Sequence, residues 1–209
     1  MRKKEALQLV PLGEQFYQPR AEMVAPLLLG HFLIHETVEG VVGGIIVETE
    51  AYGQNDPACH ASRGQTARNA TMFGKAGLSY VYFIYGCHFC VNAVCCPEGI
   101  AEAVLIRAIE PAFGEERMMA NRGVKRESLT NGPGKLCSAL GITREANGLD
   151  LTDPKSPLRI CRNSDQKQFI DEKGPVVATT RIGISKAMDL PHRFYLEKSM
   201  DVSRRASSR

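Results

Sequence analysis

The sequence predicts one α+β domain built on a largely antiparallel β-sheet with flanking helices. Its 209 residues, of which 44% are hydrophobic, suit one large domain with a substantial core better than two small ones. Several strand-like segments, rich in β-branched and aromatic residues, follow one another along the chain. Together these segments predict the antiparallel sheet, and the few helical patterns are short.

The expected elements follow in chain order. A short helix is expected over residues 20–29, where Gly30 ends it and Pro26 is an awkward member. The strands expected next are at 32–36, 41–52, 79–85, 89–96 and 103–109. Helical patterns occur around 114–121 and 134–140, the second after the turn signal Asn131-Gly132-Pro133. Later strands are expected at 158–161, 176–184 and 193–197.

The organisation of the chain is simple. We expect one domain over residues 1–200, followed at 201–209 by a basic, serine-rich tail that is expected to be mobile. There is no run of eighteen apolar residues, and the start Met1-Arg2-Lys3-Lys4 leads into a segment too polar for a signal peptide. A soluble, intracellular protein without membrane contact is therefore expected. Seven cysteines, an odd number, favour free thiols in a reducing compartment.

Charge is distributed unevenly. The net charge of +3 comes from the two ends of the chain, because removing six terminal basic residues leaves about 20 basic against 23 acidic ones. Residues 57–97 and 128–144 contain no Asp or Glu, whereas they carry basic residues that include Arg63, Arg68 and Lys135. Such local positive surface suits a polyanion. The alternative is an ordinary solvated face.

One expected strand begins apolar and then becomes acidic, in the stretch Ile45-Ile46-Val47-Glu48-Thr49-Glu50-Ala51-Tyr52. In regular strand geometry Glu48, Glu50 and Tyr52 share one face. That face borders either water or a chemical site. Arg107 lies inside another apolar strand, where a buried guanidinium needs an acceptor, and Glu48 and Glu50 are candidates. A purely structural ion pair is the alternative.

Three of the six tyrosines occur within residues 80–85. On a regular strand Tyr80 and Tyr82 share a face and Tyr85 lies on the other. Buried hydroxyls need partners, so this cluster favours the border of a polar site over a dry aromatic core. The polar segment 58–69, with Arg63 and Arg68, is expected to be a loop suited to phosphate contacts, or else an ordinary surface loop. Asn92 interrupts a further apolar strand.

The cysteines suggest a metal site only weakly. Cys87-His88-Phe89-Cys90, followed by Cys95 and Cys96, carries zinc-ligand types, but Cys90 and Cys95 face opposite sides of a continuous strand. No second pair of suitable spacing follows. We therefore expect no metal and no redox dithiol.

Taken together, the segments resemble the alkyladenine (3-methyladenine, or methylpurine) DNA glycosylase family, the type that is not built on a helix-hairpin-helix. The resemblance runs in order across most of the chain, and the matching segments lie at 28–30, 47–52, 60–74, 80–86, 90–92, 105–111, 132–137 and 193–195. The segment from Ser199 onward matches the family poorly. The resemblance implies a curved antiparallel sheet.

The resemblance also implies roles for particular residues. Glu50 would activate the water that attacks the deoxyribose, and Arg107 would hold that water and a phosphate, with the main chain near Ile182 as a third contact. Glu48 would have a structural part. The base pocket would be formed by Tyr52, His60, Tyr82 and Asn92, the last disfavouring the exocyclic amine of guanine. DNA would be contacted by Tyr85, the wedge that fills the gap left by a flipped base, and by Arg63, Arg68 and Lys135.

The implied activity is simple hydrolysis of the N-glycosidic bond of an alkylated or deaminated purine in double-stranded DNA, which leaves an abasic site. No lysine lies within the matched catalytic segments, so no Schiff-base step is expected. The resemblance implies no cofactor, no obligate protein partner and a monomeric protein. It also implies an intracellular location together with the DNA. Two alternatives stay open: a catalytically silent nucleic-acid-binding module, and a cysteine-based metal or redox protein.

Overall fold

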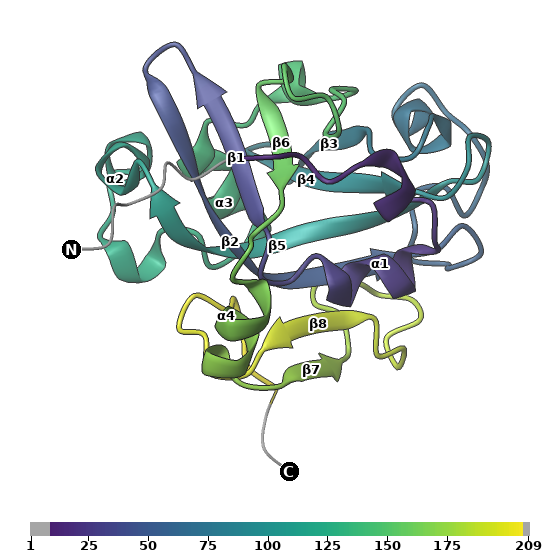
Figure 1. The fold of residues 1–209 in the computed structure, drawn as a ribbon. Coiled ribbons are helices and arrows are strands. Elements are labelled where there is room, and N and C mark those ends of the chain that lie inside the picture. Colours follow the sequence, from purple (N-terminus) through teal and green to yellow (C-terminus); the bar gives the residue numbers. More distant parts are fainter. Residues whose placement is uncertain (1–8, 207–209) are drawn as a thin grey trace.

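The structure, a computed structural model, describes residues 9–206 (Figure 1). Its sheet has eight strands, which are all paired antiparallel. The strands are β1 (Phe32–Thr37), β2 (Gly40–Tyr52), β3 (Ser79–Ile84), β4 (His88–Cys95), β5 (Glu102–Phe113), β6 (Leu158–Cys161), β7 (Val176–Thr179) and β8 (Arg193–Leu196). The helices are α1 (Ala21–Leu27), α2 (Glu115–Arg122), α3 (Pro133–Leu140) and α4 (Gln166–Lys173). The prediction of an α+β fold on an antiparallel sheet is confirmed.

Strand β2 is the centre of the sheet. The main path runs β3-β4-β5-β2-β1-β6, and β8, with β7 beside it, joins β2 separately. One edge of β2 pairs with β5, whereas its other edge pairs first with β1 and then, at Glu48–Glu50, with β8. The acidic half of β2 therefore lies between β5 and β8. In Figure 1, β7 and β8 lie at the lower side of the molecule, below β2 and α1.

Two adjacent glycines let β2 approach its neighbours closely. A Cβ on Gly43 would clash with the carbonyl oxygen of Leu33 on β1, and a Cβ on Gly44 would clash with that of Glu110 on β5. Glycine is therefore needed here because its backbone is in contact on both sides, and the register against β5 shifts at this step.

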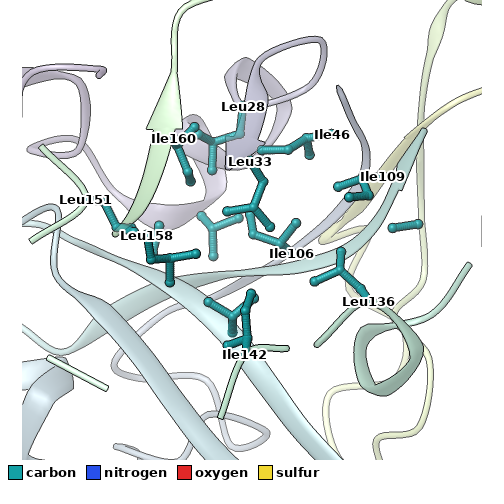
Figure 2. Close-up of a cluster of buried hydrophobic side chains, with 14 of the residues drawn as sticks. Leu28, Leu33, Ile46, Ile106, Ile109, Leu136, Ile142, Leu151, Leu158 and Ile160 are labelled. Carbon is teal, nitrogen blue, oxygen red and sulfur yellow. The ribbon is translucent and has the colours of Figure 1, made fainter. Parts of the chain in front are cut away.

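The main core lies between the sheet and the helices α1 and α3 (Figure 2). The elements that contribute side chains to it include α1, β1, β2, β5, α3 and β6. Examples that are at most 1% exposed are Leu28, Leu33, Ile46, Ile106, Leu136 and Ile160. Helix α1 is also attached to β2 by a hydrogen bond, in which the Thr49 hydroxyl donates to the Ala25 carbonyl at 2.9 Å. Polar contact and apolar burial together fix the acidic strand against α1.

Several predicted elements differ from the structure at their ends. The strand expected at 176–184 ends at Thr179, and the residues after it form a loop that reaches β2. Helix α4 was not predicted, because its few apolar residues give little helical periodicity. The expectation of a mobile tail does not fit residues 201–206: Asp201 and Val202 are buried, and Ser203 is hydrogen bonded to Glu48. Residues 207–209 of that tail lie outside the described residues.

We predict that Gly44→Ala lowers the free energy of unfolding by about 1–3 kcal/mol, because the added methyl group must displace the β5 backbone. Urea denaturation measures the change. Gly13→Ala is the matched control: its φ is −71° and nothing lies within 4 Å of the added Cβ, so its effect should stay within about 0.5 kcal/mol. Equal stability of the two variants would contradict the packing argument.

Candidate active site

A cavity of about 650 Å³ opens where β3, β4 and β5 meet the 57–72 loop and the loop after β7. Its walls carry four cationic side chains and no carboxylate, the cations being Arg63, Arg68, Arg107 and Lys186. Aromatic side chains form much of the rest, namely those of Tyr52, His60, Tyr80, Tyr82, Tyr85 and His88. Most of the residues that line the cavity come from segment 57–97, which contains no Asp or Glu. The composition of this segment therefore contributes to the absence of carboxylates from the cavity wall.

Glu50 lies directly behind the cavity wall and is fully buried. Its Oε1 accepts a hydrogen bond from the Ile182 main-chain N–H at 2.8 Å. Its Oε2 accepts one from the Tyr52 hydroxyl at 2.8 Å and lies 3.1 Å from Nη1 of Arg107. Those three partners all line the cavity. Three groups that line the cavity therefore orient the carboxylate.

Arg107 joins the two buried carboxylates. Its Nε lies 3.0 Å from Oε1 of Glu48, and its Nη1 contacts Glu50. The β2–β5 register steps from Glu48↔Ala108 to Thr49↔Ile106, so Arg107 is the extra residue of a β-bulge. Bulges re-aim a side chain, and this one lets Arg107 reach both carboxylates. Burial opposes the charge of Arg107, but Glu50 and Glu48 outweigh it and raise its pKa.

A second arginine completes this network. Arg193, on β8, places Nη1 2.9 Å from Oε1 of Glu48 and donates from Nε to the Thr180 carbonyl at 3.0 Å. Two buried arginines therefore face two buried carboxylates, so the charges balance. Sequence reasoning gave Arg193 no role; the available signal was a charged residue at the start of an aromatic strand.

Tyr52 is held from both sides. Its hydroxyl donates to Glu50, while the Arg181 guanidinium lies over its ring, 4.6 Å from the centroid. Burial, and after it the Glu50 carboxylate, raises the pKa of Tyr52, so the phenol keeps the proton that it donates. Arg181 is fully buried, pairs with Asp56 and donates to the Ala51 carbonyl at 2.9 Å. Sequence reasoning missed both Arg181 and Asp56.

His60 and two tyrosines form an aromatic wall. Nδ1 of His60 and the Tyr80 hydroxyl share a hydrogen bond of 2.9 Å, and the His60 and Tyr82 rings meet edge to face at 4.5 Å between centroids. The guanidinium of Arg68 lies 5.6 Å from the Tyr82 ring centroid. Partial desolvation beside the aromatic rings, and then the Arg68 charge, lower the pKa of His60, which favours the neutral ring. Burial raises the pKa of Tyr80 to about 12.

Tyr85 lies at the mouth of the same cavity, and its side chain is 77% exposed. The expectation that it faces away from Tyr80 and Tyr82 is wrong. Strand β3 ends at Ile84, and Tyr85 adopts a left-handed backbone with φ of 56°, so the alternation of the strand no longer applies. Opposite it, a Cβ on Gly183 would lie 4.0 Å from the Tyr85 hydroxyl.

The other predicted residues divide into two groups. Asn92, Ile182, Arg63 and Arg68 all line the cavity, and Nδ2 of Asn92 is fixed by donation to the Tyr80 carbonyl at 2.9 Å. Lys135 does not line it. Its Nζ donates to Oδ1 of Asn131 at 2.8 Å, on the helix α3 whose first residues, Pro133 and Gly134, reach the cavity. Lys186 lines the cavity although sequence reasoning did not single it out.

The cysteines do not form a metal-ligand cluster in the described part of the chain. All seven are free, and only Cys87 among them is exposed. Between residues 9 and 206 no group of three or more His, Cys, Asp or Glu side chains could hold a metal ion. Burial raises the pKa of the Cys59 thiol to about 11. None of the helices described is long and apolar enough to cross a membrane.

Comparisons of the chain with a family model and with individual proteins point to the same family. A family model described as Methylpurine-DNA glycosylase (MPG) matches residues 15–200. A protein of Methanoculleus marisnigri is 50% identical over 195 residues, which cover 93% of this chain and 99% of the relative. A protein of Francisella tularensis (strain FSC 198) is 48% identical over 182 residues, covering 87% and 92%, respectively. Both relatives are named "Putative 3-methyladenine DNA glycosylase".

We predict that the pKa of His60, measured by NMR titration of its ring, lies below the ordinary value of 6.5. The folded state then takes up this proton less readily than the unfolded chain, so protonation lowers stability as the pH falls through 6.5. Arg68→Met should raise the pKa part of the way back, because it removes the neighbouring charge. His60→Asn identifies the resonance, and a pKa at or above 6.5 would contradict the lowered pKa of this ring.

Proposed function

Because the chain belongs to the methylpurine-DNA glycosylase family, we propose that it removes damaged purines from double-stranded DNA by hydrolysing the N-glycosidic bond. One observation carries the proposal. Glu50 is a fully buried carboxylate that Arg107, Tyr52 and the Ile182 N–H orient at the back of an aromatic cavity. The product is an abasic site, and the reaction belongs to base excision repair.

The cavity suits a purine that has rotated out of the duplex. Flipping costs a few kcal/mol, least for a damaged or poorly paired base, and stacking on aromatic rings returns about 1–3 kcal/mol. The faces of Tyr52 and Tyr82 attract a cationic, methylated purine. Asn92 is fixed by its bond to the Tyr80 carbonyl, so it cannot withdraw from the exocyclic amine of guanine. Alkylated purines and hypoxanthine enter, and guanine is disfavoured.

The chemistry follows from the position of Glu50. Bond cleavage builds positive charge on the sugar, which a nearby carboxylate stabilises while it takes a proton from water. Arg107 holds that water and the adjacent phosphate, and its raised pKa keeps it cationic. A cationic base leaves without general-acid help. Lys186 is exposed at the cavity wall and is not among the groups that contact Glu50, so we assign it no nucleophilic part.

The duplex is held by the basic rim. Arg63 and Arg68 contact phosphates at the cavity, and Lys135 extends this contact along α3. Tyr85, exposed at the mouth, fills the gap that the flipped base leaves. The activity places the protein with DNA, and a monomer is sufficient for it, since every residue named here comes from one chain.

We predict that the protein releases hypoxanthine or ethenoadenine from a duplex oligonucleotide without added metal, and that the strand breaks only after hot alkali. Glu50→Gln should lower the single-turnover rate by about 100-fold or more, because the general base is lost. Its binding to lesion-containing DNA should be equal or tighter, because a negative charge near the phosphate path is removed.

Glu172→Gln, an exposed carboxylate on α4, is the control and should keep full activity. Strand cleavage without alkali would contradict simple hydrolysis and direct attention to Lys186. Wild-type protein that binds the lesion duplex but releases no base would favour the silent binding module.

We also predict that Tyr85→Ser weakens the affinity for a lesion duplex by roughly 5- to 150-fold, which corresponds to the loss of about 1–3 kcal/mol of stacking. Tyr85→Phe keeps the ring and should stay within about twofold of wild type. Fluorescence anisotropy with a labelled duplex measures both variants. If the serine variant binds as tightly as the phenylalanine variant, Tyr85 does not act as a wedge.

A further inference from the structure

The carboxy-terminal segment 201–206, which follows β8 in the chain, contacts the buried ion-pair network of Glu48, Arg107 and Arg193. Asp201 forms an ion pair with Arg126, at 2.5 Å between Oδ1 and Nη1. The Arg204 carbonyl accepts from Nη1 of Arg193 at 2.8 Å, and the Ala206 N–H donates to the Tyr195 hydroxyl at 3.1 Å. The first residue of the segment is therefore held by Arg126, and its last residues are held against β8.

Ser203, in the middle of this segment, contacts both members of the Glu48–Arg107 pair. Its main-chain N–H donates to Oε2 of Glu48 at 2.7 Å, and its hydroxyl donates to Oε1 at 2.8 Å. The same hydroxyl oxygen accepts from Nη2 of Arg107 at 3.3 Å. One side chain thus supplies a donor to the carboxylate and an acceptor to the guanidinium.

With Ser203 in place, all three nitrogens of the Arg107 guanidinium have partners. Nε contacts Glu48, Nη1 contacts Glu50, and Nη2 contacts the Ser203 hydroxyl. A planar guanidinium held at three points has one orientation. Without the Ser203 hydroxyl, Nη2 would lose its partner on the side away from the cavity.

The network extends to the loop that carries Ile182. Glu48 binds Arg193, and Arg193 donates to the Thr180 carbonyl, two residues before the N–H that holds Oε1 of Glu50. Ser203 therefore acts, through Glu48, on two of the three groups that orient Glu50. The third, Tyr52, is fixed separately by Arg181.

We propose that Ser203 is a positioning residue for the reaction: through Glu48 it holds Arg107 and the Ile182 loop in the arrangement that Glu50 requires. This inference rests on the proposed function. Ser203 does not line the cavity, so its loss should slow the chemical step while DNA binding is retained. Small displacements of a catalytic group cost up to about 100-fold in rate.

The test compares single-turnover rates of base release, at protein concentrations that saturate a hypoxanthine duplex. Ser203→Ala should be slower than wild type by roughly 10- to 100-fold. Its affinity for a duplex with a stable abasic analogue should change by less than about threefold, since no cavity residue is altered. Ser203→Thr keeps the hydroxyl and should recover most of the rate, a recovery that a general loss of stability would not give.

Arg205→Ala is the matched control in the same segment. Arg205 contacts the carbonyls of Glu197 and Ser199 rather than Glu48, so its loss should leave the rate unchanged. Rates are compared at a temperature at which circular dichroism shows every variant folded. If the wild type is active and Ser203→Ala is equally fast, the role of Ser203 is overturned but the proposed function is not. The same holds if Ser203→Thr is as slow as Ser203→Ala. An inactive wild type overturns the proposed function and this role with it.

Discussion

Arg107 lies between two fully buried carboxylates, and the rest of the site is arranged around this contact. Glu48 and Glu50 are each 0% exposed, and both would be costly as isolated charges in the interior. Removing one partner of such a network leaves an uncompensated charge, which costs several kcal/mol. The network therefore constrains β2, β5 and β8 to one relative placement. Strand β2 contributes the two carboxylates, and β5 and β8 each contribute one arginine.

The sheet explains how these residues meet. Antiparallel pairing brings Glu50 opposite Leu105 on one edge of β2 and opposite Arg193 on the other. The bulge at Arg107 turns its side chain toward both carboxylates. Close backbone contact at Gly43 and Gly44 fixes the start of the same strand. The aromatic cavity then forms on the side of β2 where Tyr52 continues the alternation begun by Glu48 and Glu50.

Local patterns in the sequence were enough to predict the strands and the grouping of Glu50, Tyr52 and Arg107. Alternation places side chains on one face, and a buried arginine requires an acid. Contacts that depend on distant segments could not be found in this way. The pairing of Arg181 with Asp56 joins residues 125 positions apart, and Ser203 reaches Glu48 over 155 positions. The face of Tyr85 was predicted wrongly because the left-handed residue that ends β3 is a tyrosine, whereas glycine is the usual signal.

The account depends most on where a damaged base and its attacking water lie relative to Glu50. A crystal structure of the wild-type protein with a duplex carrying a 2′-fluorinated hypoxanthine nucleotide, which resists formation of the oxocarbenium ion, shows both. We expect the base between Tyr52 and Tyr82, the Tyr85 ring in the gap of the duplex, and a water within hydrogen-bond distance of Glu50 and Arg107. A base that stays stacked in the duplex, or a water held by residues other than Glu50, would contradict the account.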